Sequence, residues 1–283
     1  MPIQAEHLRP MTSTEATDGT GFLLLTPLHI LRDILARFFI YIGEISILVW
    51  RSIRYILRGS IDLSDLLQQM SVIGVNSVPI AVLTTFTSAA VISLYFSNFL
   101  LQYGAAGLTG AVVALALSRE LAPVLVGVVV AARAGSAIAA EIGTMKVTEQ
   151  IDALRSLAVS PIQYLIVPRL LACLIMMPIL CVVADTAGLF GGYLIAVHQG
   201  VPPESFPQGI KLYVIPRDFV MGMIKTVVFG TIIALVGCHQ GLETKGGATG
   251  VGRATTNAVV IAIVLIYISD FFLAYIMFGG RIV

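Results

Sequence analysis

The strongest constraint on the fold is a stretch without any charged residue, which runs between Asp65 and Arg119. A soluble protein cannot bury so long an apolar stretch in one core element, whereas about 20 apolar residues span a bilayer as a helix. The stretch is therefore long enough for two membrane crossings. The whole chain has the same character: 57% of its residues are hydrophobic and 12% are charged, against about 25% charged residues in a soluble domain. We expect an all-α integral membrane protein.

Other classes of protein are disfavoured by the charge balance and by the reactive side chains. The formal net charge is +1, which gives no basic footprint for nucleic acid. Cys173, Cys181 and Cys238 lie in apolar runs without the spacing or histidine company of a metal site. The histidines are scattered, and no Ser-His-Asp or Cys-His set is credible. We therefore expect no enzyme activity, no metal and no cofactor in this chain.

Hydrophobic segments predict five transmembrane helices within a membrane domain at 61–283. The third apolar segment contains Pro168 and Pro178, so it is either one kinked helix or a re-entrant pair. The five predicted spans are about 72–100, 105–140, 162–197, 219–237 and 258–278.

The amino-terminal part differs from the spans. Residues 1–20 are polar and resemble neither a signal nor a transit peptide, so we expect a disordered cytoplasmic tail. Residues 21–60 keep apolar residues at helical spacing but carry several arginines and Glu44, which would each cost roughly 2–3 kcal/mol at the bilayer centre. An interfacial amphipathic helix avoids that cost, and a poor first transmembrane helix is the alternative. The arginines are Arg32, Arg37, Arg51, Arg54 and Arg58.

Basic residues predict the orientation of the chain. With five crossings, most of them fall on the amino-terminal side, which the positive-inside rule makes cytoplasmic. The carboxy terminus should then face outward. Besides the amino-terminal arginines, the basic residues on this side are Lys146, Arg155, Arg169, Lys245 and Arg253.

Small residues recur every fourth position in the second span, which lets another helix approach one of its faces closely. That face could pack within the chain or form the seam of a homodimer, and the pattern alone does not separate the two. The row consists of Gly127, Ala131, Gly135, Ala139 and Gly143, and a second row in the third span consists of Gly188, Gly192, Ala196 and Gly200.

Two polar segments separate spans on the predicted cytoplasmic side. Residues 141–161 carry apolar residues on one helical stripe and charged residues elsewhere, which predicts a short amphipathic helix ended by Pro161. It could present a surface to a cytoplasmic partner or be a solvated loop helix. The glycine-rich segment 241–252 lacks the spacing of a phosphate-binding loop, so we expect a flexible cytoplasmic turn.

Ionisable residues inside spans are candidate functional residues, because burying their charge must be offset by a partner or a wet cavity. Arg119 and Glu120 lie in the second span and Lys225 in the fourth. Glu120 and Lys225 could pair across helices and line a polar patch for a substrate with a charged head, or form a structural ion pair. Asp185 and Asp270 lie in the third and fifth spans.

Long motifs resemble one family. The segment 116–172, which contains SRELAPVLVG and EIGTMKVTEQIDALRSLAVSP, closely resembles the MlaE/YrbE permeases of Mce-linked ABC lipid transporters. IKTVVFG at 224–230, TKGGATGVGRATTNAVV at 244–260 and the closing SDFFLAYIMFG extend the resemblance to about residues 66–278. About twenty residues before Gly21 have no counterpart in the family.

The resemblance implies a permease homodimer in a bacterial inner membrane, two partner ATPase subunits that bind ATP and Mg, and an Mce-domain protein on the outer side. It implies that Arg119, Glu120 and Lys225 lie at a cavity for phospholipid or a similar amphiphile. A proton-coupled secondary transporter and a non-transporting anchor for a cytoplasmic complex are the alternatives. The coupling helix that docks on the ATPase would contain Met145, Lys146, Thr148, Glu149, Ile151, Asp152, Leu154 and Arg155.

Overall fold

The computed structural model describes residues 19–57 and 62–279, and within these ranges all regular structure is helical. The chain forms two compact units, residues 1–47 and 48–283. Most of the predicted tail at 1–20 lies outside the described residues. The predicted amino-terminal helix is present as α1 (Gly19–Leu57), a continuous helix of 39 residues. Five other helical segments, and not α1, are long and apolar enough to cross a membrane among the described residues, as predicted.

Each of the five spans is longer than its apolar stretch in the sequence. Because the polar residues at their ends continue the helices, the helices extend beyond the predicted spans at seven of the ten ends. The spans are Leu63–Gln102, Ala106–Val147, Ile162–His198, Pro216–Leu242 and Gly247–Phe278.

The first span contains a break, and Arg133 of the second span stabilises it. α2 (Leu63–Ile73) ends at Gly74, and a short 3₁₀ turn leads into α3 (Val78–Gln102). A break of this kind leaves carbonyl groups of the last helical turn without their usual partners. The Arg133 guanidinium donates to the Val72 carbonyl at 2.9 Å and to the Ser77 hydroxyl at 3.2 Å.

The second span changes its helical pitch twice. Its α-helical parts are α4 (Thr109–Ala116), α5 (Ala122–Val130) and α6 (Ser136–Val147). π-helical turns at Leu117–Leu121 and Ala131–Gly135 join them. Such turns insert one extra residue into a helix and are frequent at functional sites. Both of these turns carry charged residues of the span: Arg119 and Glu120 in the first, and Arg133 in the second.

The third span is one helix, which excludes the re-entrant alternative. A π-helical turn at Ile162–Ile166 continues directly into α8 (Val167–His198), and Pro178 lies inside that helix without ending it. α9 (Ser205–Tyr213) follows, and then α10 (Pro216–Leu242) and α11 (Gly247–Phe278). The turn between α10 and α11 covers only 243–246, so the predicted flexible turn at 241–252 was too long, because its glycines belong largely to the two helices.

The first row of small residues and the second row as far as Ala196 pack within the chain, whereas Gly200 is exposed and lies beyond the end of α8. Gly127 faces Phe229 of α10 and Ile266 of α11, and a Cβ atom at Gly192 would lie 2.9 Å from the Val113 side chain of α4. Ala131 and Ala139 are fully buried in the same face as Gly127. The buried residues of the rows therefore bring the second and third spans close to neighbouring helices of one protomer, and these residues are not free to form a dimer seam.

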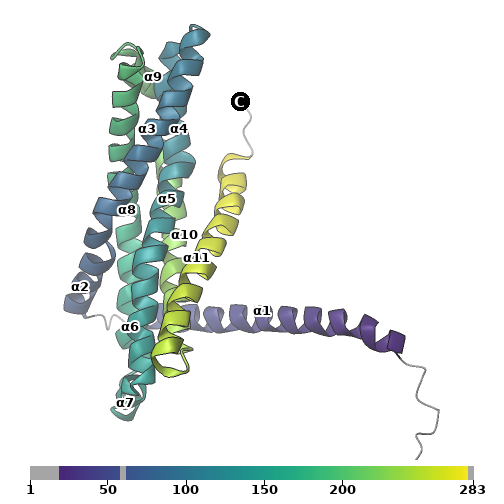
Figure 1. Ribbon diagram of the computed structural model, residues 1–283. Helices are drawn as coiled ribbons and strands as arrows, with labels where there is room; N and C mark the ends of the chain where they lie inside the picture. Colours follow the sequence, from purple (N-terminus) through teal and green to yellow (C-terminus); the bar gives the residue numbers. More distant parts are fainter. Residues whose placement is uncertain (1–18, 58–61, 280–283) are drawn as a thin grey trace, which may run out of the picture. The chain divides into compact units, whose positions relative to one another are not determined.

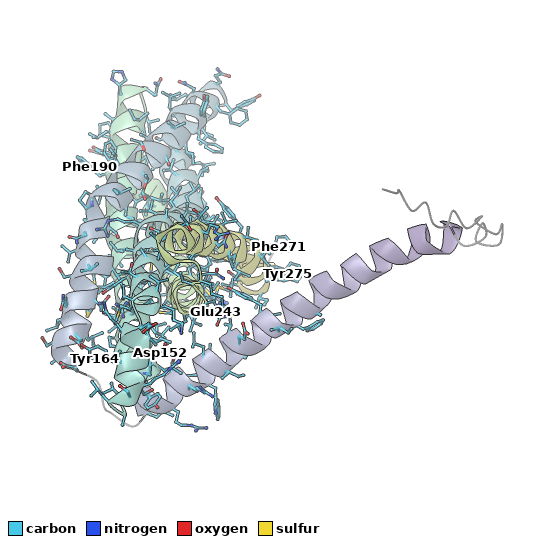
Figure 2. The ribbon with its side chains drawn as sticks, turned by 60° about the horizontal axis from the view of Figure 1, so that its bottom comes forward. Asp152, Tyr164, Phe190, Glu243, Phe271 and Tyr275 are labelled. Atoms are coloured by element: carbon cyan, nitrogen blue, oxygen red, sulfur yellow. The ribbon has the colours of Figure 1, made fainter. Side chains whose placement is uncertain are left out.

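The bundle has two distinct ends (Figure 1). α7 (Gln150–Ser156) and the turn between α10 and α11 lie at one end, and α9 lies at the other. We call the end with α7 the coupling end. Figure 2 brings the coupling end forward, with Asp152 on α7, and shows Phe271 and Tyr275 of α11 projecting away from the bundle.

Candidate functional site

The charge cluster is centred on Lys225, whose side chain is fully buried in α10. Its ammonium group donates three hydrogen bonds, which is the full number it can make. The acceptors are the Glu120 carboxylate at 2.8 Å, the Asp270 carboxylate at 2.9 Å and the Arg119 backbone carbonyl at 2.9 Å. One lysine thus ties the second, fourth and fifth spans together.

Arg119 forms a second ion pair beside the first. Its guanidinium contacts one carboxylate oxygen of Asp218 through two nitrogens, at 2.8 and 3.1 Å. The other carboxylate oxygen of Asp218 accepts from the Ile215 backbone N–H at 3.2 Å, which satisfies a donor at the start of α10. Asp218 therefore holds Arg119 and caps the helix that carries Lys225.

The cluster opens onto an apolar hollow. Leu115, Ala116 and Phe278 line this hollow of about 320 Å³ together with Arg119 and Glu120. The Phe278 ring centroid lies 4.8 Å from the Arg119 guanidinium carbon, a distance that allows cation–π attraction. The surface of the hollow thus combines aliphatic and aromatic groups with one exposed carboxylate and one exposed guanidinium.

The carboxylates around Lys225 differ in exposure. The Glu120 side chain is 43% exposed, whereas that of Asp270 is 15% exposed. Lys225 balances one of these negative charges, and Arg119 and Asp218 balance each other. The cluster therefore carries a formal charge of −1, and Glu120 is the carboxylate that can meet a ligand.

The backbone brings α10 close enough for these contacts. Arg119 and Glu120 lie in the π-helical turn Leu117–Leu121. A Cβ atom at Gly222 would lie 2.1 Å from the Ser118 carbonyl oxygen, so only glycine allows α10 to cross the turn at this distance. Lys225 follows Gly222 by three residues, on nearly the same face of the helix.

The structure brings together more charged residues than the sequence indicated. The predicted pairing of Glu120 with Lys225 is confirmed. Asp270 was predicted to lie inside a span but was not assigned to Lys225, because sequence does not show which helices are neighbours. Asp218 was missed, because the fourth span was predicted to begin at 219. Asp185 lies elsewhere in α8, and its carboxylate accepts a hydrogen bond from the Cys181 thiol at 4.0 Å.

The predicted coupling helix is two pieces instead of one. Met145 and Lys146 belong to the end of α6, and α7 begins only at Gln150. Between the two helices Glu149 has φ of 60°, a left-handed conformation that breaks the helix. The single helical stripe predicted within 141–161 is therefore wrong.

Four of the eight predicted coupling residues are nevertheless polar and exposed at the coupling end: Thr148, Glu149, Asp152 and Arg155. Asp152 contacts the Arg155 guanidinium at 2.9 Å and the Lys146 ammonium at 3.7 Å, which links the two pieces. Ile151 is fully buried and fixes α7 to the bundle, while Thr148 and Glu149 are exposed. We call Met145–Arg155 the coupling segment.

Comparisons with known proteins give one matching family and several similar proteins. The family described as Permease MlaE matches residues 66–276. A probable ABC transporter permease protein of Synechocystis is 44% identical over 227 residues, which cover 80% of this chain and 86% of that protein. A probable ABC transporter permease protein of Rickettsia prowazekii is 39% identical over 257 residues, which cover 90% and 99%. Protein TRIGALACTOSYLDIACYLGLYCEROL 1, chloroplastic, of Arabidopsis thaliana is 40% identical over 238 residues, which cover 84% and 68%.

Proposed function

This chain belongs to the MlaE permease family, and we propose that as an ABC transporter permease it moves phospholipid or a similar amphiphile between the membrane and an Mce-domain protein. The observation that carries the substrate class is the charge cluster around Lys225, which opens onto an apolar hollow. A lipid has the matching combination of charged head group and apolar chains. The name of the Arabidopsis relative contains that of a glycolipid, which supports a lipid substrate here.

The energy would come from a partner ATPase, which would bind the ATP and Mg. The coupling segment supports this proposal, because it presents charged, exposed side chains at one end of the bundle while Ile151 fixes it to the spans. A surface of this kind can take up a displacement and pass it to the helices above it. The chain itself would then be a transport subunit without catalytic residues.

The packing suggests how such a displacement would reach the cluster. A Cβ atom at Gly143 of α6 would lie 2.8 Å from the Thr244 hydroxyl, and one at Gly241 would lie 3.1 Å from the Ala139 carbonyl oxygen. α6 and the turn after α10 are therefore in close contact. A shift of the coupling segment would move α10 and α11 relative to the second span. This movement would change the position of Lys225 relative to its partners in the charge cluster. The helices would then have two arrangements, one before and one after this movement. The affinity for lipid would depend on the population of each arrangement.

We propose a homodimer as the working unit, with a seam outside the two rows of small residues. The rows are already used between helices of one protomer. Much of α11 remains exposed, including Val264 and Phe271, and such a surface can face lipid or a second copy. The Mce-domain protein would meet the end of the bundle that carries α9.

We propose a bacterial inner membrane as the location, with the amino terminus cytoplasmic and the carboxy terminus outward. Basic residues at the coupling end, such as Lys146 and Lys245, support this orientation. α1 would lie in the cytoplasmic interface, since Glu44 and its arginines disfavour a crossing. Residues 61–283 would form the permease domain.

Transport by the reconstituted complex tests the proposal. The chain is purified with its ATPase and Mce-domain partners and placed in vesicles of phosphatidylethanolamine, phosphatidylglycerol and a fluorescent phospholipid. We expect lipid transfer that requires ATP and is lost on substitution of Lys225 by methionine, while the complex stays assembled. Val264→Ala, on the exposed face of α11, is a control for the effect of a substitution inside a span.

Three outcomes would contradict parts of the proposal. Transfer driven by a pH gradient without ATPase would indicate a secondary transporter. Normal transfer by the Lys225 variant, together with its loss on substitution of exposed coupling residues, would remove the cluster from the substrate path. A chain that recruits the ATPase but moves no lipid would be a membrane anchor.

A further inference from the structure

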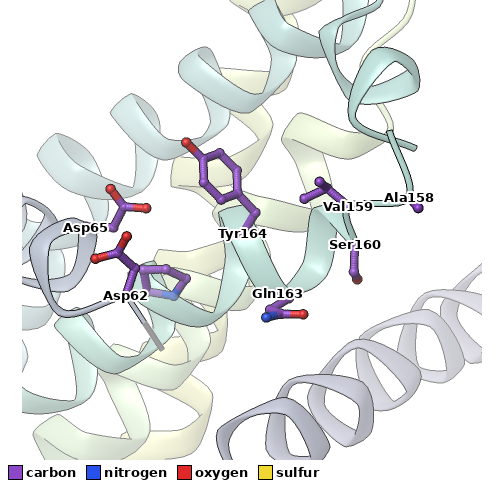
Figure 3. A pocket seen from close by; sticks show the side chains of 8 residues that line it. Asp62, Asp65, Ala158, Val159, Ser160, Gln163 and Tyr164 are labelled. Atoms are coloured by element: carbon purple, nitrogen blue, oxygen red, sulfur yellow. The ribbon is translucent and has the colours of Figure 1, made fainter. Parts of the chain in front are cut away.

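At the coupling end, a groove separates α6 from the first and third spans. α6 packs mainly against α10 and α11, whereas α2 packs mainly against α8. Figure 3 shows a hollow of about 310 Å³ between α2 and the start of the third span, which the link 158–160 after α7 also borders. An adjoining hollow of about 200 Å³ is lined by Glu141 and Met145 of α6 and by residues of α2 and α8. The two hollows share Asp65 and Tyr164, and we call them together the groove.

An ion pair crosses the groove from α6 to α8. The side chain of Arg169 is 4% exposed, and its guanidinium contacts the Glu141 carboxylate at 2.7 Å and donates to the Leu165 carbonyl at 2.6 Å. Glu141 lies about one helical turn before Met145, the first residue of the coupling segment. Charge-assisted hydrogen bonds from a guanidinium have fixed directions, whereas apolar contacts allow helices to slide. The pair therefore fixes the coupling end of α6 relative to α8.

A second arginine ties the same part of the second span to the first span. Arg133 lies in the π-helical turn Ala131–Gly135, directly before α6. Its guanidinium donates to the Val72 carbonyl at 2.9 Å and to the Ser77 hydroxyl at 3.2 Å, on the two sides of the break between α2 and α3. We call these contacts and the pair of Arg169 with Glu141 the arginine bridges. They connect the second span with the first and third spans where the groove prevents close packing.

The first and third spans also support the turn that carries two charges of the cluster. Leu117 of the π-helical turn Leu117–Leu121 belongs to a buried apolar cluster with Ala89 of the first span and Cys181 of the third. The position of these two spans therefore affects where the turn lies relative to Lys225 of α10. A displacement of α6 reaches α10 by direct packing, but it reaches the first and third spans only if it crosses the groove.

From these contacts we infer that the arginine bridges are positioning contacts, which make the first and third spans follow the coupling segment. This role rests on the proposed function. When the ATPase displaces the coupling segment, α6 carries both spans with it, and the turn Leu117–Leu121 moves relative to Lys225. Without the bridges the groove takes up the displacement. ATP is then hydrolysed, but less lipid is transferred for each ATP.

The amount of lipid transferred per ATP tests this role. The chain is placed with its ATPase and Mce-domain partners in vesicles of phosphatidylethanolamine, phosphatidylglycerol and a fluorescent phospholipid, and lipid transfer and ATP hydrolysis are measured in the same sample. We expect Glu141→Gln and Arg133→Met each to lower the lipid transferred per ATP about tenfold, the loss expected for a charge-assisted hydrogen bond. ATP hydrolysis should continue. The side chain of Glu141 is 56% exposed, so its replacement by glutamine should preserve the fold.

Rescue variants and a control separate positioning from stability. Glu141→Arg combined with Arg169→Glu exchanges the charges and should recover part of the lipid transferred per ATP, whereas neither single change should. Arg133→Lys keeps a charged donor and should recover part of it as well. Val113→Ala is the control, because Val113 packs with Phe206 in an apolar cluster at the α9 end of the bundle. It should lower the melting temperature without changing the lipid transferred per ATP.

Four results would overturn the inference in a wild-type complex that transfers lipid. They are wild-type transfer per ATP in Glu141→Gln or Arg133→Met, no recovery on charge exchange, and an equal loss in Val113→Ala. The fourth is loss of the ATPase from the purified Glu141→Gln complex, which would place Glu141 in the docking surface. A wild-type complex that hydrolyses ATP without moving lipid would refute the proposed function, and the role of the bridges with it.

Discussion

Replacement of Lys225 by methionine tests whether the charge cluster behaves as one unit. Methionine is unbranched like lysine and of similar length, so the change removes the charge with little change in volume. Lys225 is fully buried and Asp270 is 15% exposed, so the variant leaves a carboxylate without its cation in a poorly solvated place. Breaking a buried ion pair from one side costs about 3–5 kcal/mol. We expect the lower end of that range, because Glu120 is 43% exposed and can be hydrated.

A double-mutant cycle isolates the interaction. The combination of Lys225→Met with Asp270→Asn removes both charges, so the loss of unfolding free energy should be at least about 1 kcal/mol smaller than the sum of the two single losses. Unfolding of the purified chain in detergent, followed by tryptophan fluorescence and circular dichroism, provides the free energies. Additivity within about 0.5 kcal/mol, or a loss below about 1 kcal/mol for Lys225→Met alone, would refute the reasoning.

Three further changes test the local geometry. Gly222→Ala should lower the unfolding free energy by about 1–3 kcal/mol, because the added methyl group clashes with the Ser118 carbonyl. Gly252→Ala is the control, because its methyl group meets open space, and equal melting temperatures of the two variants would contradict the predicted clash. Because Glu149 has a positive φ, Glu149→Gly should preserve or raise the unfolding free energy, and Glu149→Val should lower it by about 1 kcal/mol. A higher melting temperature for the valine variant than for the glycine variant would disprove the strain. Asp152→Asn should change the unfolding free energy by less than about 1 kcal/mol, because the ion pairs of Asp152 are exposed. The same change should reduce the amount of ATPase that co-purifies with the chain, and an unaltered amount would count against a docking role of Asp152.

Particular residues show how far the sequence could be read. The uncharged stretch after Asp65 required membrane crossings whatever the tertiary structure, because lipid offers no partner to backbone groups outside a helix. The pairing of Glu120 with Lys225 could be expected from charge alone. Asp218 could not, since a residue at the start of a helix looks like a loop residue until the helix bounds are known.

The sequence-based predictions of helices failed mainly where the backbone departs from a regular α-helix. A single amphipathic helix within 141–161 follows from apolar periodicity, but periodicity does not reveal the left-handed residue Glu149 that divides this segment. The π-helical turn at Leu117–Leu121 has no sequence signature as strong as apolar periodicity, although it carries Arg119 and Glu120.

The sequence alone determined that the chain crosses a membrane five times and that it carries charges inside those crossings, because the solvation of each segment depends on its own residues. Only the tertiary structure decided which charges meet and that the rows of small residues pack within one protomer. It also decided that Asp218, at the start of α10, pairs with Arg119 of the second span. These relations depend on which helices are neighbours and on their rotation, and both follow from packing between distant segments.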